Sequence, residues 1–198
     1  MSTASDAEAE RGARVFVGRQ RELAELETHL GSTLSGRGGV VLLGGEPGIG
    51  KTRLLDELGV RARDAGVPPL WGRCWEEGGA PAYWPWVQIL RAGLRHDDPA
   101  RVASVIGNQA AFLGALLPEL PGAAPVAGTA LPATGVESEH RRFALFDAVG
   151  SFFRTIAGPR RVLVLLDDVH AADGPSLRLL AHASSGVGVR SGGCRGRR

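Results

Sequence analysis

The feature that most constrains this chain is a glycine-rich octapeptide between an apolar run and a helical pattern. Residues 45–52 read Gly-Glu-Pro-Gly-Ile-Gly-Lys-Thr; the apolar run Val40–Leu43 precedes them, and a helix is expected over Lys51–Ala65. A short apolar run bounded by glycines is typical of a buried parallel strand. Strand, loop and helix together are the context in which the pattern G-x-x-x-x-G-K-[ST] binds phosphate. An incidental glycine-rich turn is disfavoured because all three elements agree.

The predicted loop has the chemistry to hold a nucleoside triphosphate with magnesium. Its glycines let successive backbone N–H groups point at one phosphate, and the helix N-terminus directs its dipole at the same anion. We expect Lys51 to bridge the β- and γ-phosphates and the Thr52 hydroxyl to bind magnesium. The predicted nucleotide contacts are Gly45, Glu46, Pro47, Gly48, Ile49, Gly50, Lys51, Thr52 and Arg53.

A second apolar run, Arg161–Leu166, ends in two aspartates. Asp167 and Asp168 are therefore expected at the carboxyl edge of a buried strand, where open α/β sheets bind ligands. We expect Asp167 to hold the magnesium hydration shell and Asp168 to orient or deprotonate the water that attacks the γ-phosphate. In the alternative interpretation, the two aspartates only end the strand and cap the next turn. Lys51 and Asp168 are accordingly the candidate catalytic residues.

The other segments alternate between helical and strand patterns. Leucines at helical spacing predict an amphipathic helix over Arg19–Leu34, and Val67–Arg73 is a plausible second strand. The alternation predicts an α/β fold, specifically the three-layer sandwich of a P-loop NTPase around a parallel sheet. Further helical patterns cover Tyr83–Leu94, Pro99–Leu117, Glu137–Ala157 and Ser176–Ala183.

Composition divides the chain into one domain and two flanks. We expect a disordered acidic leader over residues 1–12, an ATPase-type domain over 13–183 with an irregular Pro/Gly/Ala-rich linker at 118–135, and a disordered Gly/Arg-rich tail over 184–198. The net charge is +2, and four arginines lie in the tail, so the body is net negative at −2. Direct DNA binding is therefore not expected. No apolar run approaches the roughly 20 residues of a membrane helix, so we expect no membrane contact and a cytoplasmic location.

For the cysteines and the tryptophans we expect structural roles rather than chemical ones. Only two cysteines, Cys74 and Cys194, are present, without metal-ligand spacing, and Cys74 is expected to be a small buried residue. Aromatic side chains lie more often in cores than on surfaces. We therefore expect core positions for the four tryptophans, Trp71, Trp75, Trp84 and Trp86.

With both motifs placed, the sequence resembles the ATPase modules of the signalling STAND class within the AAA+ superfamily, which are related to origin-recognition ATPases. It is most similar to those of large LuxR-type, MalT-like regulators. Two positions depart from the usual pattern, because Gln20 replaces a Glu and Ala171 replaces a Trp. The resemblance rests on Val15–Arg19, Gly44–Leu54, Trp71–Cys74, Pro81–Trp86 and Leu165–Asp173.

The resemblance implies further properties. Val17, Gly18 and Arg19 would lie beside the adenine and ribose. ADP would hold the protein closed, an inducer and ATP would open it, and slow hydrolysis would reset the switch. Self-association would follow in the full-length protein, acting in transcriptional control.

The resemblance also implies a strand that inserts between the two apolar strands and carries a polar sensor. Residues 186–193 offer at best a short, glycine-weakened strand, so we expect the sensor strand to be missing. We interpret the chain as truncated, with the tail an out-of-frame reading of a GC-rich gene. Two other functions stay open, a P-loop phosphotransferase and an inert or non-catalytic fragment.

Overall fold

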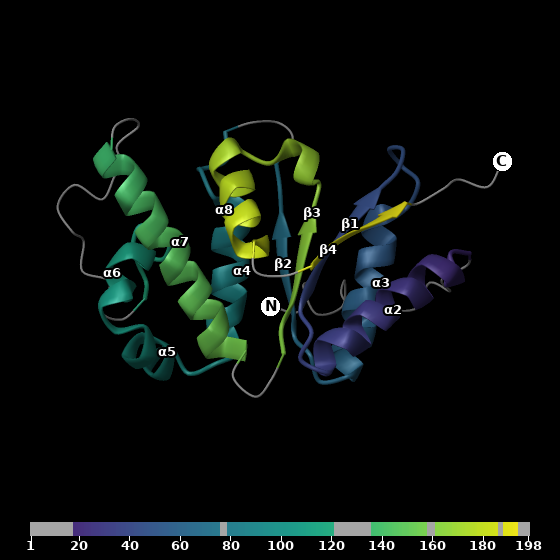
Figure 1. Ribbon diagram of the computed structural model, residues 1–198, viewed down its shortest axis with the longest axis horizontal. Helices are drawn as coiled ribbons and strands as arrows, with labels where there is room; N and C mark the ends of the chain where they lie inside the picture. The colour runs from purple at the N-terminus through teal and green to yellow at the C-terminus, as the bar shows by residue number, and fades with distance from the viewer. Residues whose placement is uncertain (1–17, 76–78, 121–135, 158–160, 186–187, 194–198) are drawn as a thin grey trace, which may run out of the picture.

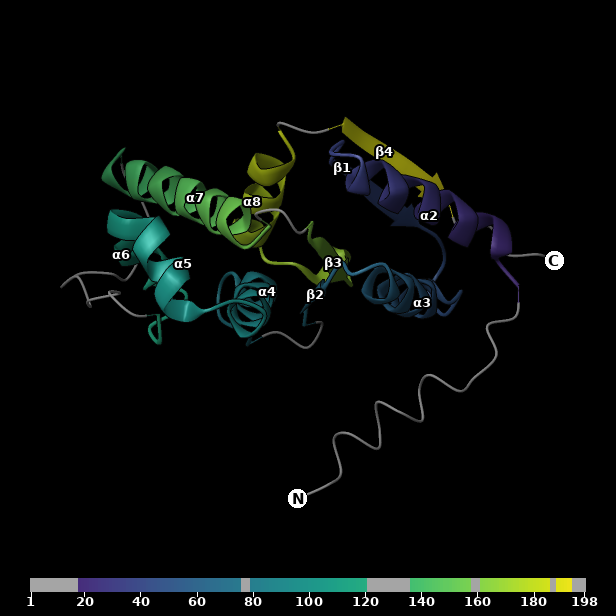
Figure 2. The same cartoon turned by 90° about the horizontal axis from the view of Figure 1, so that it is seen from below.

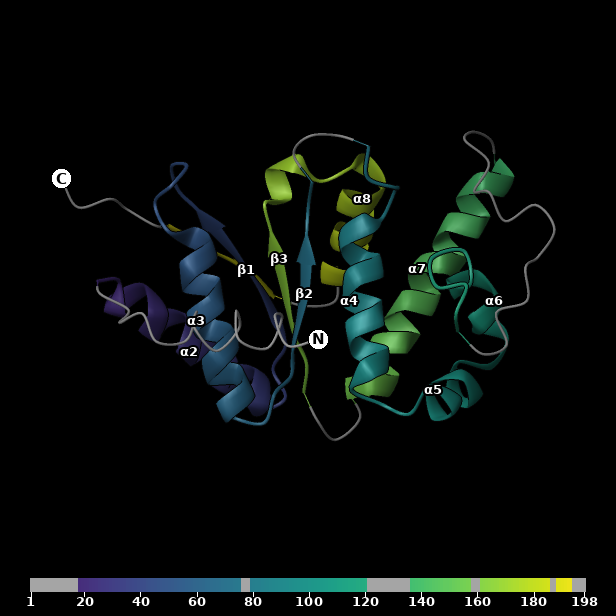
Figure 3. The same cartoon turned by 180° about the vertical axis from the view of Figure 1, so that it is seen from behind.

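The computed structural model describes residues 18–75, 79–120, 136–157, 161–185 and 188–193. Val17, the leader 1–12 and most of the linker, residues 121–135, lie outside the described residues. Helices α2 (Gln20–Leu34) and α3 (Lys51–Asp64) lie beside strands β1 (Gly39–Gly44) and β4 (Gly188–Gly193) at one end of the molecule (Figure 1). Helices α5 (Pro99–Ile106), α6 (Ala110–Leu113) and α7 (Val136–Ala157) form the other end. Strands β2 (Pro69–Arg73) and β3 (Leu163–Asp167) lie between these two groups, with α4 (Trp84–Arg95) beside them (Figure 3).

The strand, loop and helix predicted around the octapeptide are confirmed. β1 (Gly39–Gly44) leads through the loop into α3 (Lys51–Asp64), and the chain returns in β2 (Pro69–Arg73). α2 (Gln20–Leu34) packs against α3 and buries Leu23, Leu26 and Leu30. Its predicted apolar stripe ends there, because Leu34 is 44% exposed. These leucines form one apolar core with the buried face of α3, made of Leu54, Leu58 and Ala62.

A second and larger apolar core joins the helices that follow β2. It is centred on side chains that are fully buried, such as Ile89, Leu113 and Phe152. The described helices are all too short or too polar to cross a membrane. The elements of this part are α4 (Trp84–Arg95), α5 (Pro99–Ile106), the 3-10 turn η1 (Gly107–Gln109), α6 (Ala110–Leu113), α7 (Val136–Ala157), β3 (Leu163–Asp167), the 3-10 turn η2 (Val169–Ala171) and α8 (Gly174–Ser184).

The strands form two parallel pairs. β2 pairs with β3, with Pro69 opposite Leu163 and Arg73 opposite Asp167. β1 pairs with β4 (Gly188–Gly193). Within the described ranges no ladder joins one pair to the other, and Figure 2 shows them apart. The α/β class with parallel strands is confirmed, whereas the single three-layer sandwich is not.

The tail differs from its prediction at β4. The sequence predicts a disordered tail over 184–198 with at best a short, glycine-weakened strand, yet α8 continues to Ser184 and Gly188–Gly193 pairs with β1 in parallel. The prediction weighed the low strand propensity of glycine. Backbone hydrogen bonds along β1 do not depend on side chains, and they outweigh that preference here.

Candidate functional site

The glycine-rich loop leaves β1 at Gly44 and enters α3 at Lys51. Gly48 and Gly50 have left-handed backbone angles, with φ of 72° and 91°, which glycine adopts without steric cost. Gly50 is also the N-cap of α3 and supplies no side-chain cap. The backbone N–H groups of the first turn therefore keep their capacity to bind an anion, which the helix dipole also favours.

Lys51 is the only lysine among the 198 residues of the chain. Its ammonium group donates hydrogen bonds to the carbonyl oxygens of Gly45 and Glu46, at 3.0 and 3.1 Å. These bonds hold the only primary side-chain amine over the loop. Lysine is a compact, mobile point charge, so phosphate oxygens can exchange with those carbonyl oxygens as its partners.

The predicted acidic strand end is formed by the last residue of β3 and the residue after it. Asp167 is 5% exposed, and one carboxylate oxygen accepts a hydrogen bond from the Asp168 backbone N–H at 3.1 Å. Its carbonyl oxygen accepts from the Cys74 N–H at 3.2 Å, which extends the pairing of β2 with β3. Asp168 has a left-handed φ of 53°, which is uncommon for a residue with a Cβ. The chain therefore turns sharply just after the buried carboxylate.

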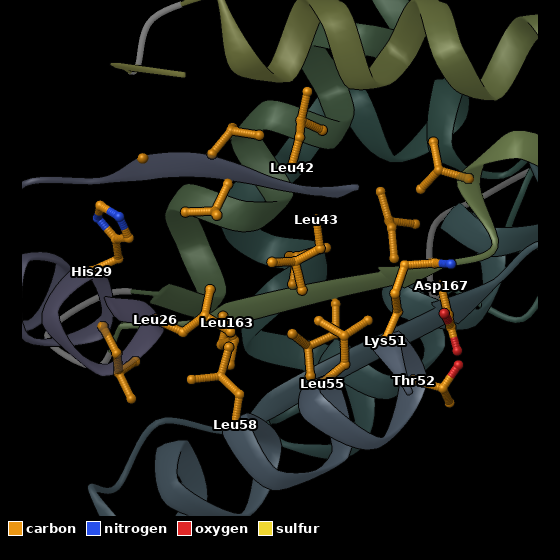
Figure 4. A pocket seen from close by; sticks show the side chains of 18 of the residues that line it. Leu26, His29, Leu42, Leu43, Lys51, Thr52, Leu55, Leu58, Leu163 and Asp167 are labelled. Carbon is orange, nitrogen blue, oxygen red and sulfur yellow. The ribbon is translucent and has the colours of Figure 1, made fainter. Parts of the chain in front are cut away.

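The loop and the strand end meet at one end of a cavity. The side chains of Lys51, Thr52 and Asp167 gather there, and the Thr52 hydroxyl and the Asp167 carboxylate point toward one another (Figure 4). Hydroxyl and carboxylate oxygens are hard ligands that suit magnesium, which binds few protein groups and keeps several waters. The described residues contain no cluster of three or more His, Cys, Asp or Glu that would form a metal site of its own. The pair fits a magnesium ion shared with phosphate.

The cavity is larger than a nucleotide pocket needs to be. Its volume is about 1670 Å³, above the roughly 300–1,000 Å³ of common ligand pockets. Leucines of β1 and β3 line its middle, and Leu26 and His29 of α2 lie at the end away from Lys51 (Figure 4). The cavity thus follows the separation of the two strand pairs, and its polar end is the candidate site.

The structure does not bring every predicted site residue to this cavity. Arg53 and the loop glycines line it, but Glu46, Ile49, Gly18 and Arg19 are not among its lining residues. Gly18 and Arg19 have left-handed backbone angles just before α2. The Nη1 atom of Arg19 is buried and has no hydrogen-bond partner among the described residues. The third predicted adenine contact, Val17, lies outside the described part of the chain.

Cys74 lies directly after β2, behind the acidic strand end. Burial raises the pKa of its thiol to about 11, and the negative charges of Asp173, Asp168 and Asp167 add to the effect. The side chain is 8% exposed, so the expectation of a small buried residue is confirmed. At neutral pH the thiol is protonated and a poor nucleophile.

Sequence reasoning missed two residues that fix the surroundings of this site. The Gln88 side chain of α4 pairs with the backbone of Arg73, donating to its carbonyl oxygen at 2.9 Å and accepting from its N–H at 3.3 Å. Asp173 caps α8 and also accepts from the backbone N–H of Tyr83, the N-cap of α4. An Asp before Gly-Pro and three residues before Ser is a recognisable cap pattern. Nothing in the sequence around Gln88 indicates its role.

A parallel α/β scaffold with a glycine-rich loop, a loop lysine and an acidic strand end defines a P-loop ATPase class of site. The chain matches the family described as AAA ATPase domain over residues 15–190. It therefore belongs to that family and is an AAA-type, nucleotide-binding P-loop ATPase module. The matched range passes the predicted domain end at residue 183 and reaches into β4. Comparisons with curated proteins and with solved structures gave no match.

Proposed function

We propose that this chain binds ATP with magnesium between residues 45–53 and the carboxyl end of β3, and hydrolyses it slowly. The observation that carries the proposal is the meeting of Thr52 and Asp167 beside the only lysine, Lys51 (Figure 4). A cation, two oxygen donors and a helix N-terminus then surround one position suited to a polyphosphate.

Each residue has a distinct role in this proposal. The loop amides and Lys51 hold the β- and γ-phosphates, while Thr52 and Asp167 hold magnesium, which supplies charge neutralisation on the phosphates. Asp168 accepts a proton from water as the water oxygen bonds to the γ-phosphorus. The bond from that phosphorus to the bridging oxygen breaks, and ADP and phosphate leave. Asp reaches less far than Glu, so we expect slow turnover.

The biological role that we infer is a regulatory switch in transcriptional control, as in the STAND-type, LuxR-like modules that the sequence resembles. ADP would favour a closed form and ATP an open, self-associating form in the full-length cytoplasmic protein. DNA would bind elsewhere, because the body of this chain is not basic. For the adenine and ribose we propose Val17, Gly18 and Arg19. The Arg19 Nη1 atom is buried without a partner in the described part of the chain, which gives this segment a donor for a ligand.

Binding of a fluorescent ATP analogue with magnesium tests the proposal. Wild type should bind, Lys51→Ala should lose most of the affinity, and Lys51→Arg should keep the charge but bind less well, since the two cations differ in shape. Arg63→Ala removes an exposed cation from the last turn of the same helix and is the matched control, with affinity unchanged. Circular dichroism verifies that each variant is folded.

Other outcomes separate the alternatives. Folded wild type that binds no nucleotide would defeat the proposal and favour a non-catalytic fragment. ATP-dependent phosphorylation of a small acceptor, exceeding phosphate release to water, would favour a phosphotransferase.

A further inference from the structure

Two residues with strained backbone lie at the two ends of one hydrogen-bonded connection beside the site. Asp168 and Tyr83 both have left-handed φ angles, 53° and 64°, although each carries a Cβ. Asp173 follows Asp168 by five residues, and its carboxylate accepts a hydrogen bond from the Tyr83 N–H at 3.4 Å. Such angles persist only where the surrounding structure imposes them. Asp173 is therefore a candidate for the group that imposes them here.

The Asp173 carboxylate fixes the start of α8 as well as the start of α4. One oxygen accepts from the Ser176 N–H at 2.9 Å, and the other accepts from the Ser176 hydroxyl at 2.6 Å. The Trp86 indole N–H donates to the Ser176 carbonyl oxygen at 3.1 Å, and both side chains are 2% exposed. The Trp86–Ser176 bond is buried and the Asp173 bonds are partly buried, and such bonds favour one arrangement. They join the first turn of α4 to the first turn of α8.

The segment from Asp168 to Asp173 is a short, hydrogen-bonded connection between β3 and α8. The Ala171 N–H donates to the Asp168 carbonyl oxygen at 2.8 Å, and the Ala172 N–H donates to that of Val169 at 3.1 Å. These bonds close a single tight turn, η2, between the end of β3 and the cap of α8. A displacement of Asp173 therefore reaches Asp168 through one short turn.

α4 is also held against the neighbouring strand. Gln88 pairs with the backbone of Arg73, which lies opposite Asp167 in the β2–β3 register. A Cβ on Gly72 would lie 2.6 Å from the Pro85 carbonyl oxygen, so helix and strand are in close contact. The first two turns of α4 therefore pack on β2, whose last residue Arg73 lies opposite Asp167 of the acidic edge.

We propose that Asp173 is a positioning residue that places Asp168 for hydrolysis and couples this acidic edge to α4. The inference rests on the proposed ATPase function for its catalytic consequence. In this proposal Asp173 acts through the turn that begins at Asp168. Any partner that shifts α4 against α8 would then change the hydrolysis rate with little effect on nucleotide affinity.

Hydrogen–deuterium exchange without nucleotide tests the structural half of the proposal. In Asp173→Ala, the amides of Ala171 and Ala172 should exchange at least about tenfold faster, because opening of the turn costs less when its downstream anchor is lost. Ser176→Ala removes only the hydroxyl bond and should change exchange in the same direction by less. The amides of α3 should not change. Unchanged exchange at Ala171 and Ala172 in both variants would overturn the positioning role.

Single-turnover ATP hydrolysis tests the catalytic half. Asp173→Ala should lower the hydrolysis rate about tenfold to a hundredfold, since small misplacements at a reacting centre have effects of this size, while the Kd of the ATP analogue stays within about twofold. Asp173→Asn, which keeps an oxygen acceptor, should restore much of the rate. Equal losses in rate and affinity, or no loss of rate, would contradict the proposal.

The matched control is Asp98→Ala. Asp98 accepts from the Ala100 N–H at 3.0 Å at the start of α5, far along the chain from the site. Its loss should remove a comparable helix cap and leave hydrolysis unchanged. If wild type binds no ATP, the proposed function fails, yet the exchange experiment still decides whether Asp173 positions the turn.

Discussion

The Thr52 hydroxyl and the Asp167 carboxylate point toward one another from two elements that are 115 positions apart in the sequence (Figure 4). Thr52 belongs to the first turn of α3, and Asp167 is the last residue of β3. Parallel strands bring their carboxyl ends to one edge of the sheet, and a helix that follows such a strand starts at the same edge. The topology therefore accounts for their meeting.

The first prediction concerns magnesium. Asp167→Asn keeps the side-chain shape and an oxygen acceptor for the Asp168 N–H, but it removes the negative charge. We expect the magnesium-dependent part of ATP binding to weaken about tenfold to a hundredfold, the range found when groups that support a metal are altered. Titration of the ATP analogue in magnesium and in EDTA measures this difference. Thr52→Ser, which retains the hydroxyl, should behave like wild type, and identical magnesium titrations for Asp167→Asn and wild type would contradict the assignment.

The second prediction uses the single lysine. An amine-acetylating reagent has only two targets in this chain, the Lys51 side chain and the N-terminal amine. At about ten times its Kd, ATP with magnesium should slow acetylation of Lys51 about tenfold, because only the free protein reacts. Mass spectrometry of the two sites provides the measurement and its internal control, since the N-terminal amine should label at the same rate throughout. Equal protection of both amines would point to a nonspecific effect of the nucleotide.

The parts of this molecule that the sequence predicts are those fixed by local patterns. The loop at residues 45–52 and the acidic end at Asp167 follow from motifs whose strand and helix neighbours are adjacent in the chain. The alternation of elements likewise predicts the α/β class. Trp71 and Trp84 are partly buried and Trp86 is buried, but Trp75 is 56% exposed, so the core prediction is wrong for Trp75.

The remaining features depend on partners distant in the sequence. β4 is rich in glycine and has only a weak strand signal of its own, and its place follows from hydrogen bonds to β1. The bond from Tyr83 to Asp173 joins residues 90 positions apart. The sequence also gives no sign that the two strand pairs are separate, because the apolar patterns of β1 and β3 would equally suit one continuous sheet.

The third prediction concerns alkaline pH. Burial raises the pKa of Cys74 from 9.0 to about 11, so between these values the unfolded chain loses the thiol proton while the folded protein keeps it. Stability should therefore fall as pH rises from 9 to 11, by at most about 1.4 kcal/mol per pH unit for this group. Urea unfolding at pH 8 and pH 10, in EDTA without nucleotide, measures the fall. Cys74→Ala should show a smaller fall, and an equal pH dependence in both proteins would exclude this cause.

The fourth prediction compares two glycines with opposite surroundings. At Gly72 an added Cβ would lie 2.6 Å from the Pro85 carbonyl oxygen and 2.7 Å from the Ile89 Cδ1 atom, so either α4 or β2 must move. Gly72→Ala should lower the free energy of unfolding by about 1–3 kcal/mol, as overpacking does. Gly31 lies on the exposed side of α2, and a Cβ there would meet no atom within 4 Å beyond its chain neighbours and the nearby backbone of its own helix. Gly31→Ala should raise stability by roughly 0.5–1 kcal/mol, because alanine restricts the unfolded chain and favours the helix.

Urea denaturation of both variants measures these differences at the same pH. The pair also tests how closely α4 lies on β2, because the two substitutions are chemically identical and differ only in what the new methyl group meets. If Gly72→Ala proves as stable as Gly31→Ala, α4 is not packed on β2 as the structure has it. The coupling of α4 to the acidic edge would then lose its support on the β2 side, leaving only the bonds through Asp173 and Ser176.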